Sequence, residues 1–259
     1  MAIGILGGTG VYDPNILKKK KQQKIYTPYG ATSDLVTTGE MHGKDVVIIP
    51  RHGSNHFYAP HTVPYRANVY AMKQLGVTRI ISVSAVGSLK KEIKPGDFVF
   101  TDQFIDRTYG RKCTFYETGQ VCHVSVAEPF CGDVRKLLAQ CSKKLGFDFH
   151  KRGNCVVING PRFSSKAESE LYRTWDADII NMTLCPEVIL AREMEICYAN
   201  IAMVTDYDVW YEHHVTSDEV VATMKKNLNK VKKLLAEIIP SIPEKRECGC
   251  KDALKGALV

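Results

Sequence analysis

Short apolar segments alternate along the chain with longer segments of helical periodicity, and this alternation most restricts the fold. Several short segments are apolar at successive positions, which is typical of strands covered on both faces of a sheet. No Pro-, Gly- or Ser-rich linker separates two halves of the chain. The order predicts an α/β fold, namely a single domain with a central mixed β-sheet flanked by helices. The expected strands span residues 3–6, 45–49, 79–83, 98–101, 155–158, 178–180 and 199–204.

Several of the longer segments have the pattern of amphipathic helices. Residues 67–75 and 134–145 are each followed by a glycine, the usual residue after a helix C-terminus. A longer helix is expected from Thr216. In its first residues, Thr216 and Glu219 have the capping-box spacing, so each can bind a free amide of the other. Apolar residues then recur at helical spacing up to Pro240, which is expected to end the helix, and this apolar face is expected to pack on the sheet.

Length and composition exclude several classes of protein. The chain has 259 residues, of which 44% are hydrophobic and 24% charged, so it can bury a substantial core and is unlike a disordered or fibrous protein. We expect one domain over residues 1–259, with a cysteine-containing tail at about 244–259. The longest aliphatic runs have only a few residues, whereas a membrane span needs ~20. The first residues lack the basic segment of a signal peptide, so we expect a cytoplasmic protein with no membrane association.

The net charge is +7, from 35 Lys and Arg against 28 Asp and Glu, and it could attract nucleic acid, a membrane surface or a small anion. The basic residues gather in the run 18–21 and on the last helix, without aromatic residues between them. A surface that binds single-stranded nucleic acid usually has such aromatics. Charge runs of this kind are typical of solvated surfaces. We therefore expect a small anionic ligand and no nucleic-acid partner.

Nine cysteines lie between Cys113 and Cys250 without a regular spacing. In a chain of this length most are expected to be thiols of the core. The motif Cys248-Gly249-Cys250 stands apart, but it is too closely spaced for a zinc knuckle and no second pair of ligands accompanies it. We therefore expect no metal there. The motif fits either an exposed tail or a redox-sensitive, disulfide-forming pair.

Polar or glycine-rich loops follow the expected strands. In open α/β sheets ligands bind beyond the carboxyl ends of the strands, so these loops are expected to form one site. The first loop, Gly7-Gly8-Thr9-Gly10, lacks the dinucleotide fingerprint because Asp13 stands where the third glycine is needed. Its backbone amides and the Thr9 hydroxyl can hold an isolated phosphate. The loop fits equally well an ordinary turn from strand to helix.

Arg51 and His52 follow the second of these strands. Arginine has a fork of N–H donors that matches phosphate oxygens, and a neighbouring histidine can donate another hydrogen bond. Ser84, in a turn that contains glycine, and Thr183, after a later strand, add hydroxyl groups. Together with Thr9 these residues predict a site for free phosphate.

A metal site is the alternative for His52, His56 and His61. Gly53 and Pro60 disfavour the helix that would align these rings, and no carboxylate is spaced to complete a ligand set. We therefore expect no metal at this position and interpret His52 as a contact to an anion.

Asp206 and Asp208 lie one residue apart after the last expected strand, and their side chains point the same way if the strand continues. Two close carboxylates resist joint ionisation, so one of them tends to keep a proton. A protonated Asp can donate to a ring nitrogen while a carboxylate oxygen accepts from an amino group, which is the pattern that an adenine edge presents. An acidic loop that merely caps the strand is the alternative.

Taken together in chain order, these loops resemble the 5′-methylthioadenosine phosphorylases of the trimeric-type purine nucleoside phosphorylase family, and the similarity runs from Ile3 to about Pro240. The ending Cys248-Gly249-Cys250 resembles archaeal members. The matching segments are Gly7-Gly8-Thr9-Gly10, Pro50-Arg51-His52-Gly53, Ser84-Ala85-Val86-Gly87-Ser88-Leu89, Pro95-Gly96-Asp97, Asp102-Gln103-Phe104-Ile105-Asp106, Ala127-Glu128-Pro129-Phe130-Cys131, Gly160-Pro161-Arg162-Phe163-Ser164, Asn181-Met182-Thr183, Pro186-Glu187-Val188 and Thr205-Asp206-Tyr207-Asp208.

The resemblance implies reversible phosphorolysis of a purine nucleoside, without a metal or cofactor, in a homotrimer or a dimer of trimers. It implies that phosphate is bound by Thr9, Arg51, His52, Ser84, Ala85 and Thr183. For the nucleoside, it implies that Met182 lies against the pentose and that Phe163 and Asn181 flank the base. The catalytic residues Asp206 and Asp208 are implied to bind the N7 and 6-amino edge of the base. Ser217 and Val220 are implied to line the 5′ pocket, which His123 reaches from a neighbouring subunit.

Two details of the resemblance leave alternatives open. Ser217 stands where mammalian enzymes of this type have an apolar residue, and its hydroxyl could also accept a 5′-OH group. A broad-specificity purine nucleoside phosphorylase is therefore the second interpretation, and a nucleosidase or a non-catalytic purine- or phosphate-binding protein is the third. Cys131 and Cys197 correspond to positions that can pair in archaeal relatives.

Overall fold

A computed structural model describes residues 1–8, 16–211 and 217–259, without the side chains of Ser217 and Glu219. The predicted Thr9 and the capping-box residues Thr216 and Glu219 therefore lie outside the described residues or side chains, as does the Ser217 hydroxyl.

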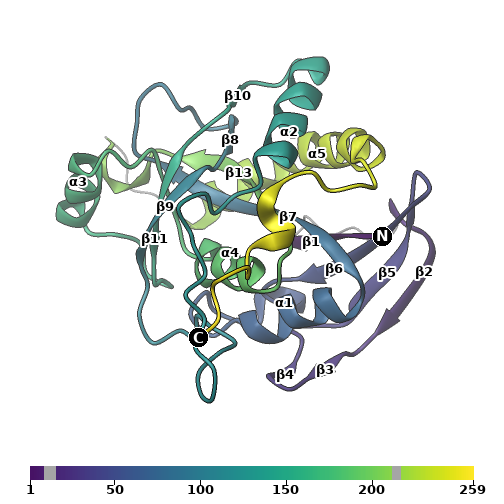
Figure 1. Ribbon diagram of the computed structural model, residues 1–259. Helices are drawn as coiled ribbons and strands as arrows, with labels where there is room; N and C mark the ends of the chain where they lie inside the picture. Colours follow the sequence, from purple (N-terminus) through teal and green to yellow (C-terminus); the bar gives the residue numbers. More distant parts are fainter. Residues whose placement is uncertain (9–15, 212–216) are drawn as a thin grey trace.

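The described residues form an 11-stranded mixed sheet with helices on both faces, so the predicted α/β class is confirmed (Figure 1). Four parallel strands make its centre, in the order β13-β7-β1-β6. Antiparallel strands flank them, with β8 next to β13, and β5 and β2 beyond β6. The bounds are β1 Ala2–Gly7, β2 Lys18–Gln23, β5 Val36–Met41, β6 Lys44–Pro50, β7 Val77–Ser88, β8 Phe98–Phe100, β9 Gln103–Arg107, β10 Phe149–His150, β11 Asn154–Ile158, β12 Ile179–Asn181 and β13 Cys197–Asp206, with β3 Tyr26–Thr27 and β4 Gly30–Ala31 as a separate pair.

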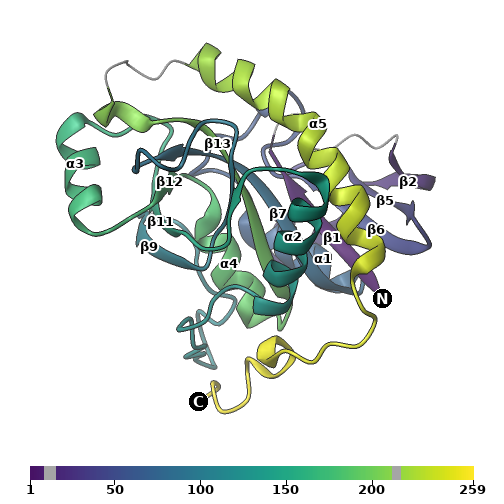
Figure 2. The same cartoon turned by 90° about the horizontal axis from the view of Figure 1, so that it is seen from above.

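Two layers of helices enclose the parallel strands. The helices α1 (Tyr65–Gln74) and α4 (Leu184–Glu193) pack together, and so do α2 (Gly132–Leu145) and α5 (Ser217–Ser241) (Figure 2). Side chains of β1 alternate between the two layers. Leu6 joins a core cluster with Val69 of α1, whereas Ile3 and Ile5 join one with Leu235 of α5. The sheet is therefore covered on both faces, as the continuous apolar strands predict.

The expected strands are all present, and the structure corrects several details. The strands β7 and β13 are longer than predicted, and α5 ends at Ser241, so Pro240 lies inside its last turn. The basic run 18–21 is exposed, as predicted, but belongs to the edge strand β2. Every residue of β2 is exposed, so its sequence has no alternation that could reveal a strand, and lysines at a sheet edge oppose pairing with other chains.

The segment after α5 returns to the body of the molecule. A short 3₁₀ turn, η4 (Gly249–Asp252), holds Cys250 in a buried position. The chain end then pairs with residues 121–123, where the His123 amide donates to the Ala257 carbonyl at 2.8 Å. Of the two interpretations of the Cys248-Gly249-Cys250 motif, the simple exposed tail is thus wrong. No helix of the described chain is long and apolar enough to cross a membrane.

Candidate active site

The predicted site residues lie at one edge of the sheet because the four central strands run parallel. Gly7 and Pro50 end their strands level with Val83 of β7, and Asp206 ends β13 further along the same edge, opposite Gly87. There β7 also pairs with β12 in antiparallel fashion, with Ile180 opposite Gly87, and this brings Asn181 to the same place. A Cβ atom on Gly87 would lie 2.9 Å from the Asp206 Oδ1 atom. Glycine at this position lets the two strands and the carboxylate approach closely.

Arg51 lies under this edge, but its guanidinium is less available than predicted. The side chain is buried and forms a two-pronged ion pair with Glu187, at 2.7 Å from Nε and 2.9 Å from Nη2. Further acceptors are the Leu6 and Val83 carbonyls and the Ser82 hydroxyl. Val83 is the only acceptor at Nη1 among the described residues, so one N–H of that nitrogen is left for an anion. Arg51 is therefore not an open fork for phosphate.

Glu187 makes the buried cation tolerable. Burial by itself would lower the pKa of Arg51, but the Glu187 carboxylate raises it above the usual value. Tyr198 donates to Glu187 Oε2 at 2.6 Å and Ser82 donates to it at 3.1 Å, so the carboxylate is fully engaged. A buried pair whose carboxylate is fully hydrogen-bonded and whose cation keeps only one N–H for a ligand is the arrangement in which charges can be kept in a core. Glu187 is therefore a candidate site residue for which the sequence pattern indicated no role.

His52 is neutral in this environment. Burial, followed by repulsion from Arg51, lowers the pKa of His52 to about 4. Its Nδ1 atom lies 2.8 Å from the Tyr58 carbonyl, and since a carbonyl only accepts, Nδ1 carries the proton. The ring stacks on His56, with 4.2 Å between centroids. The remaining atom, Nε2, is then an acceptor, and it can donate to phosphate only after it takes up a second proton.

This environment predicts a pH effect on stability. The unfolded chain protonates His52 near its usual pKa of 6.5, whereas the folded protein does so only near 4. Protons therefore favour unfolding in this window, and the contribution of neutral His52 is lost as pH falls from 6.5 toward 4. We expect the melting temperature of His52→Asn to fall less steeply than that of the parent between pH 6.5 and 4. Replacement of the exposed His61 by Asn is the matched control, and equal slopes for all three proteins would contradict the assignment.

The hydroxyl residues of the predicted phosphate site are close by and held in place. The Ser84 hydroxyl is buried and accepts from Asn200 at 3.1 Å. The Asn181 side chain donates to the Ala85 carbonyl at 3.0 Å and accepts from the amides of Thr183 and Leu184, both at 2.7 Å. Asn181 therefore links β7 to the N-terminus of α4. Both ends of the Asn181 amide are thus held by the protein itself.

The two aspartates lie together at the end of β13. Asp206 accepts from the Thr205 hydroxyl at 2.6 Å and from the Asp208 amide at 2.9 Å. Asp208 is buried and accepts from the Ser169 hydroxyl at 2.5 Å. Burial is the main cause that raises the pKa of Asp208 to about 6, and the nearby Asp206 carboxylate adds to the shift. The expectation that one of the pair keeps a proton thus fits Asp208 best.

The remaining predicted residues surround this pair less closely. Phe163 is 39% exposed, and Met182 is half-buried against Gly160, where a Cβ atom would lie 2.7 Å from the Met182 sulfur. Val220 is half-buried near the start of α5. His123 is exposed, and its backbone amide binds the Ala257 carbonyl of the chain end rather than any of the residues above. A cavity of about 300 Å³ opens beside Gly160 and is bounded by Arg107, Tyr109, Ile158, Asn159, Arg162, Glu168 and Tyr172.

Arg111 supports this side of the site and could not be found from the sequence. Its guanidinium donates to the carbonyls of Asn159 and Met182, both at 2.8 Å, and to the Cys185 carbonyl. The arginine therefore ties the loop after β11 to the loop after β12. Nothing in the local sequence pattern marks it, because its acceptors, these three carbonyls together with the Asn159 side-chain oxygen and the Tyr65 hydroxyl, all lie far along the chain.

The arrangement combines two chemical environments about the end of β7. One, the anion end, contains Arg51, His52, Ser84 and Thr183, and the other, the carboxylate end, contains Asp206 and Asp208. A cationic and hydroxyl-rich end can hold an anion, and a pair of acids with a raised pKa can share a proton with a nitrogen base.

Comparison with known proteins agrees with this geometry. The family model described as the phosphorylase superfamily matches residues 2–240. An S-methyl-5′-thioadenosine phosphorylase of Thermofilum pendens is 58% identical over 99% of this chain and 98% of its own, and one of Pyrococcus abyssi is 53% identical over 99% of each. Among solved structures, methylthioadenosine phosphorylase from Schistosoma mansoni in complex with adenine has a TM-score of 0.93 and 39% identity over 98% of this chain and 96% of its own. A methylthioadenosine phosphorylase from an antarctic soil metagenomic library has a TM-score of 0.94 and 42% identity over 99% and 92%.

The match covers the sheet, both helical layers and every described residue of the two ends of the site. Both the sequence identity and the agreement of the folds are far above the level at which a fold alone is shared. This chain therefore belongs to the phosphorylase superfamily.

Proposed function

We propose that this chain catalyses the reversible phosphorolysis of 5′-methylthioadenosine to adenine and 5-methylthioribose 1-phosphate, a pentosyl transfer that serves purine and methionine salvage. The observation that carries the proposal is the Asp206–Asp208 pair, which lies across the end of β7 from the anion end of the site. The relatives that match over nearly their whole length have names that describe the same activity.

Phosphate binds at the anion end in this proposal. Arg51 offers its remaining Nη1 N–H, and the Ser84 and Thr183 hydroxyls offer further donors. The Ala85 amide and Thr9, which lies outside the described residues, complete the set. A hydrogenphosphate dianion still carries one O–H group, and neutral His52 can accept it at Nε2. Phosphate would thus bind without the cost of protonating a buried ring.

The base binds at the carboxylate end, and the sugar lies between the two ends. As the glycosidic bond stretches, the sugar becomes oxocarbenium-like and the base becomes negative. Bound phosphate stabilises the first charge, and proton donation to N7 stabilises the second. We assign N7 to Asp206 and the 6-amino edge to Asp208, with Phe163, Asn181 and Met182 about the base and pentose. Because the pKa of Asp208 is raised to about 6, the pair can hold one shared proton near neutrality; when Asp206 holds it for N7, Asp208 is the carboxylate that accepts from the 6-amino group.

The 5′ substituent occupies a pocket formed by Ser217, Val220 and His123, the last from a neighbouring subunit. This requires a homotrimer or a homohexamer in which the site is completed between copies. Phe57 and Tyr109, which are 77% and 75% exposed in the single chain, support such an assembly because a large exposed aromatic side chain is a common interface residue. We place the enzyme in the cytoplasm, with inorganic phosphate as its co-substrate and no other cofactor.

The test is base release by the purified protein from 5′-methylthioadenosine, adenosine and inosine, each with and without phosphate. We expect release that depends strictly on phosphate and is fastest with 5′-methylthioadenosine. Comparable use of inosine would favour a broad-specificity purine nucleoside phosphorylase. Release without phosphate would indicate a nucleosidase, and no release with any substrate would reject the proposal in favour of a binding protein.

A further inference from the structure

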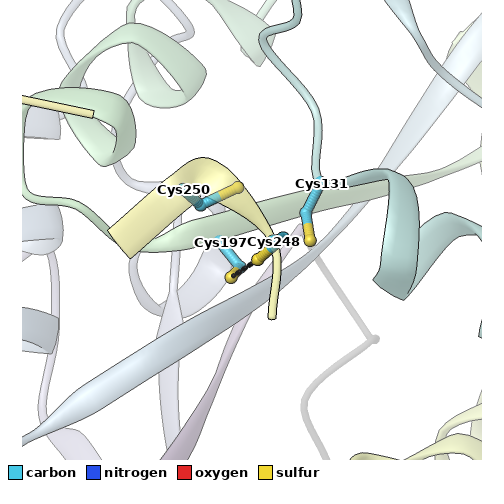
Figure 3. Close-up of side chains that lie close together, drawn as sticks. All are labelled: Cys131, Cys197, Cys248 and Cys250. Carbon is cyan, nitrogen blue, oxygen red and sulfur yellow. Dashed lines mark hydrogen bonds between the residues drawn. The ribbon is translucent and has the colours of Figure 1, made fainter. Parts of the chain in front are cut away.

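A polar side chain, Asn200, lies among apolar residues in the middle of β13. This strand begins at Cys197, beside three cysteines whose sulfur atoms lie within 4.8 Å of its own and of one another, namely Cys131, Cys248 and Cys250 (Figure 3). It ends at Asp206 of the carboxylate end. Asn200 is the only polar residue from 199 to 204, and it is 1% exposed. A buried amide is costly unless its hydrogen bonds are made, so the partners of Asn200 indicate its role.

Two neighbours fix the direction of the Asn200 amide. Its nitrogen lies 3.4 Å from the Ser82 carbonyl oxygen, which can only accept, so the NH₂ group is on this side. The amide oxygen then faces the Thr101 hydroxyl, which donates to it at 2.9 Å. Thr101 is buried and directly follows β8, the strand that pairs with β13 on the side away from β7. The NH₂ group of Asn200 is thereby directed toward β7.

Ser84 of the anion end receives a hydrogen bond from this NH₂ group. The Asn200 nitrogen donates to the Ser84 hydroxyl oxygen at 3.1 Å. Because the oxygen acts as an acceptor here, the hydrogen of the hydroxyl is left for another partner. Among the residues that the structure describes, none accepts this hydrogen. The buried Ser84 hydroxyl is therefore available to donate to a bound anion.

The same amide contacts the ion pair beneath the anion end. The Asn200 nitrogen lies 3.3 Å from the Ser82 hydroxyl. That hydroxyl accepts from Arg51 at 2.7 Å and donates to Glu187 at 3.1 Å. Ser82 and Ser84 lie two positions apart on β7, so their side chains project from the same face of the strand. Asn200 thus bonds to both serines and joins the Ser84 hydroxyl to the network that holds Arg51.

We infer that Asn200 is a positioning residue for phosphate, which acts by keeping the Ser84 hydroxyl in its donating orientation. The inference rests on the proposed function, in which phosphate binds at the anion end. A serine hydroxyl can rotate and can either donate or accept. A donor held on one side of the Ser84 oxygen leaves the hydroxyl the donating role toward the ligand. The hydroxyl is then ordered during folding rather than on binding, and this preorganisation favours affinity.

A purely structural role is the alternative for Asn200. In that case the side chain only joins Thr101 to Ser82 across two neighbouring strands. Its loss would lower the stability of the protein, whereas the affinity for phosphate would change no more than after the loss of another buried amide. The two roles therefore differ in whether the effect of Asn200 depends on the Ser84 hydroxyl.

The experiment measures phosphate affinity of the full-length protein by titration calorimetry without nucleoside, and the KM for phosphate in base release. We expect Ser84→Ala to weaken phosphate binding at least about 10-fold, since a hydrogen bond to an anion is lost. Asn200→Ala should weaken it about 5- to 10-fold, with a smaller change in the KM for nucleoside. In the double variant, Asn200→Ala should add less than about twofold to the effect of Ser84→Ala, because the hydroxyl through which it acts is absent.

Two further variants separate this effect from a loss of stability. Asn227 of α5 is also buried and its amide donates to the Val204 carbonyl of β13, so Asn227→Ala removes a buried amide beside the same strand. It should leave phosphate affinity unchanged. The pair Asn200→Leu with Thr101→Val replaces both partners of one hydrogen bond by apolar groups, a change that costs little stability. This variant should still fold and should show the same loss of phosphate affinity as Asn200→Ala.

Three results would overturn the inference. They are a phosphate affinity of Asn200→Ala within about twofold of the parent, losses that multiply fully in the double variant with Ser84→Ala, and a parent protein that binds no phosphate. A parent that binds phosphate but releases no base would contradict the proposed function alone. The calorimetric comparison of the variants would then still support or reject the role of Asn200.

Discussion

Replacement of Asp206 by Asn is expected to lower the rate of phosphorolysis of 5′-methylthioadenosine by about 10²- to 10⁴-fold, the range of general acid catalysis. The amide has the same shape as the carboxyl group, and it can still accept from the Asp208 amide through its oxygen. It cannot accept and return a proton at N7, so the base would leave as a poorly stabilised anion. The loss should therefore appear in kcat, with a smaller change in the KM for nucleoside.

A control variant and a second substrate separate this role from a general disturbance. Asp176→Asn removes an exposed carboxylate that pairs with Lys90 at the surface, and it should leave the rate unchanged. For Asp208→Asn, by contrast, the loss should be smaller with inosine, since Asp208 is assigned to the 6-amino edge and an amide in its place can donate to a 6-oxo group. Activity of Asp206→Asn near that of the parent with 5′-methylthioadenosine would show that Asp206 is not the acid.

The central strands could be predicted from the sequence because each contains an uninterrupted run of apolar residues. β1, β6, β7 and β13 are covered by helices on both faces, and this leaves an unmistakable pattern. The strands β2 and β9 and the helix α3 (Lys166–Thr174) were not predicted, and they lie at the edges, where residues are exposed or half-buried. At such positions the pairing partner rather than the local sequence decides the conformation.

Only part of the candidate site could be predicted from the sequence. Loops after parallel strands must meet at one edge, and this topological rule is enough to group Arg51, Ser84 and Asp206. No local pattern reveals that Arg51 pairs with Glu187, because 136 residues separate the two. The same holds for the contacts of Arg111, for the capping role of Asn181 and for the four cysteines that meet in the core.

Replacement of Arg51 by Met is expected to destabilise the protein by about 3–5 kcal/mol, because it leaves the Glu187 carboxylate buried without its partner. The double variant Arg51→Met, Glu187→Gln removes both charges, and the side-chain amide oxygen that replaces the carboxylate can still accept from Tyr198. It should therefore recover more than about half of the lost stability, since the largest cost in the single variant is the unpaired charge.

Phosphate binding should not recover in the double variant, and this difference separates the two roles of Arg51. The Nη1 N–H that the Val83 carbonyl leaves over is absent from both variants, so the KM for phosphate should be raised by about 10²-fold in each. Chemical denaturation measures the first effect and phosphate-dependent base release the second. A double variant as unstable as Arg51→Met would show that packing, not charge, is lost. A normal KM for phosphate would show that Arg51 is a structural residue whose ion pair with Glu187 only holds the strand ends together. Phosphate binding would then depend on His52, Ser84 and Thr183 alone.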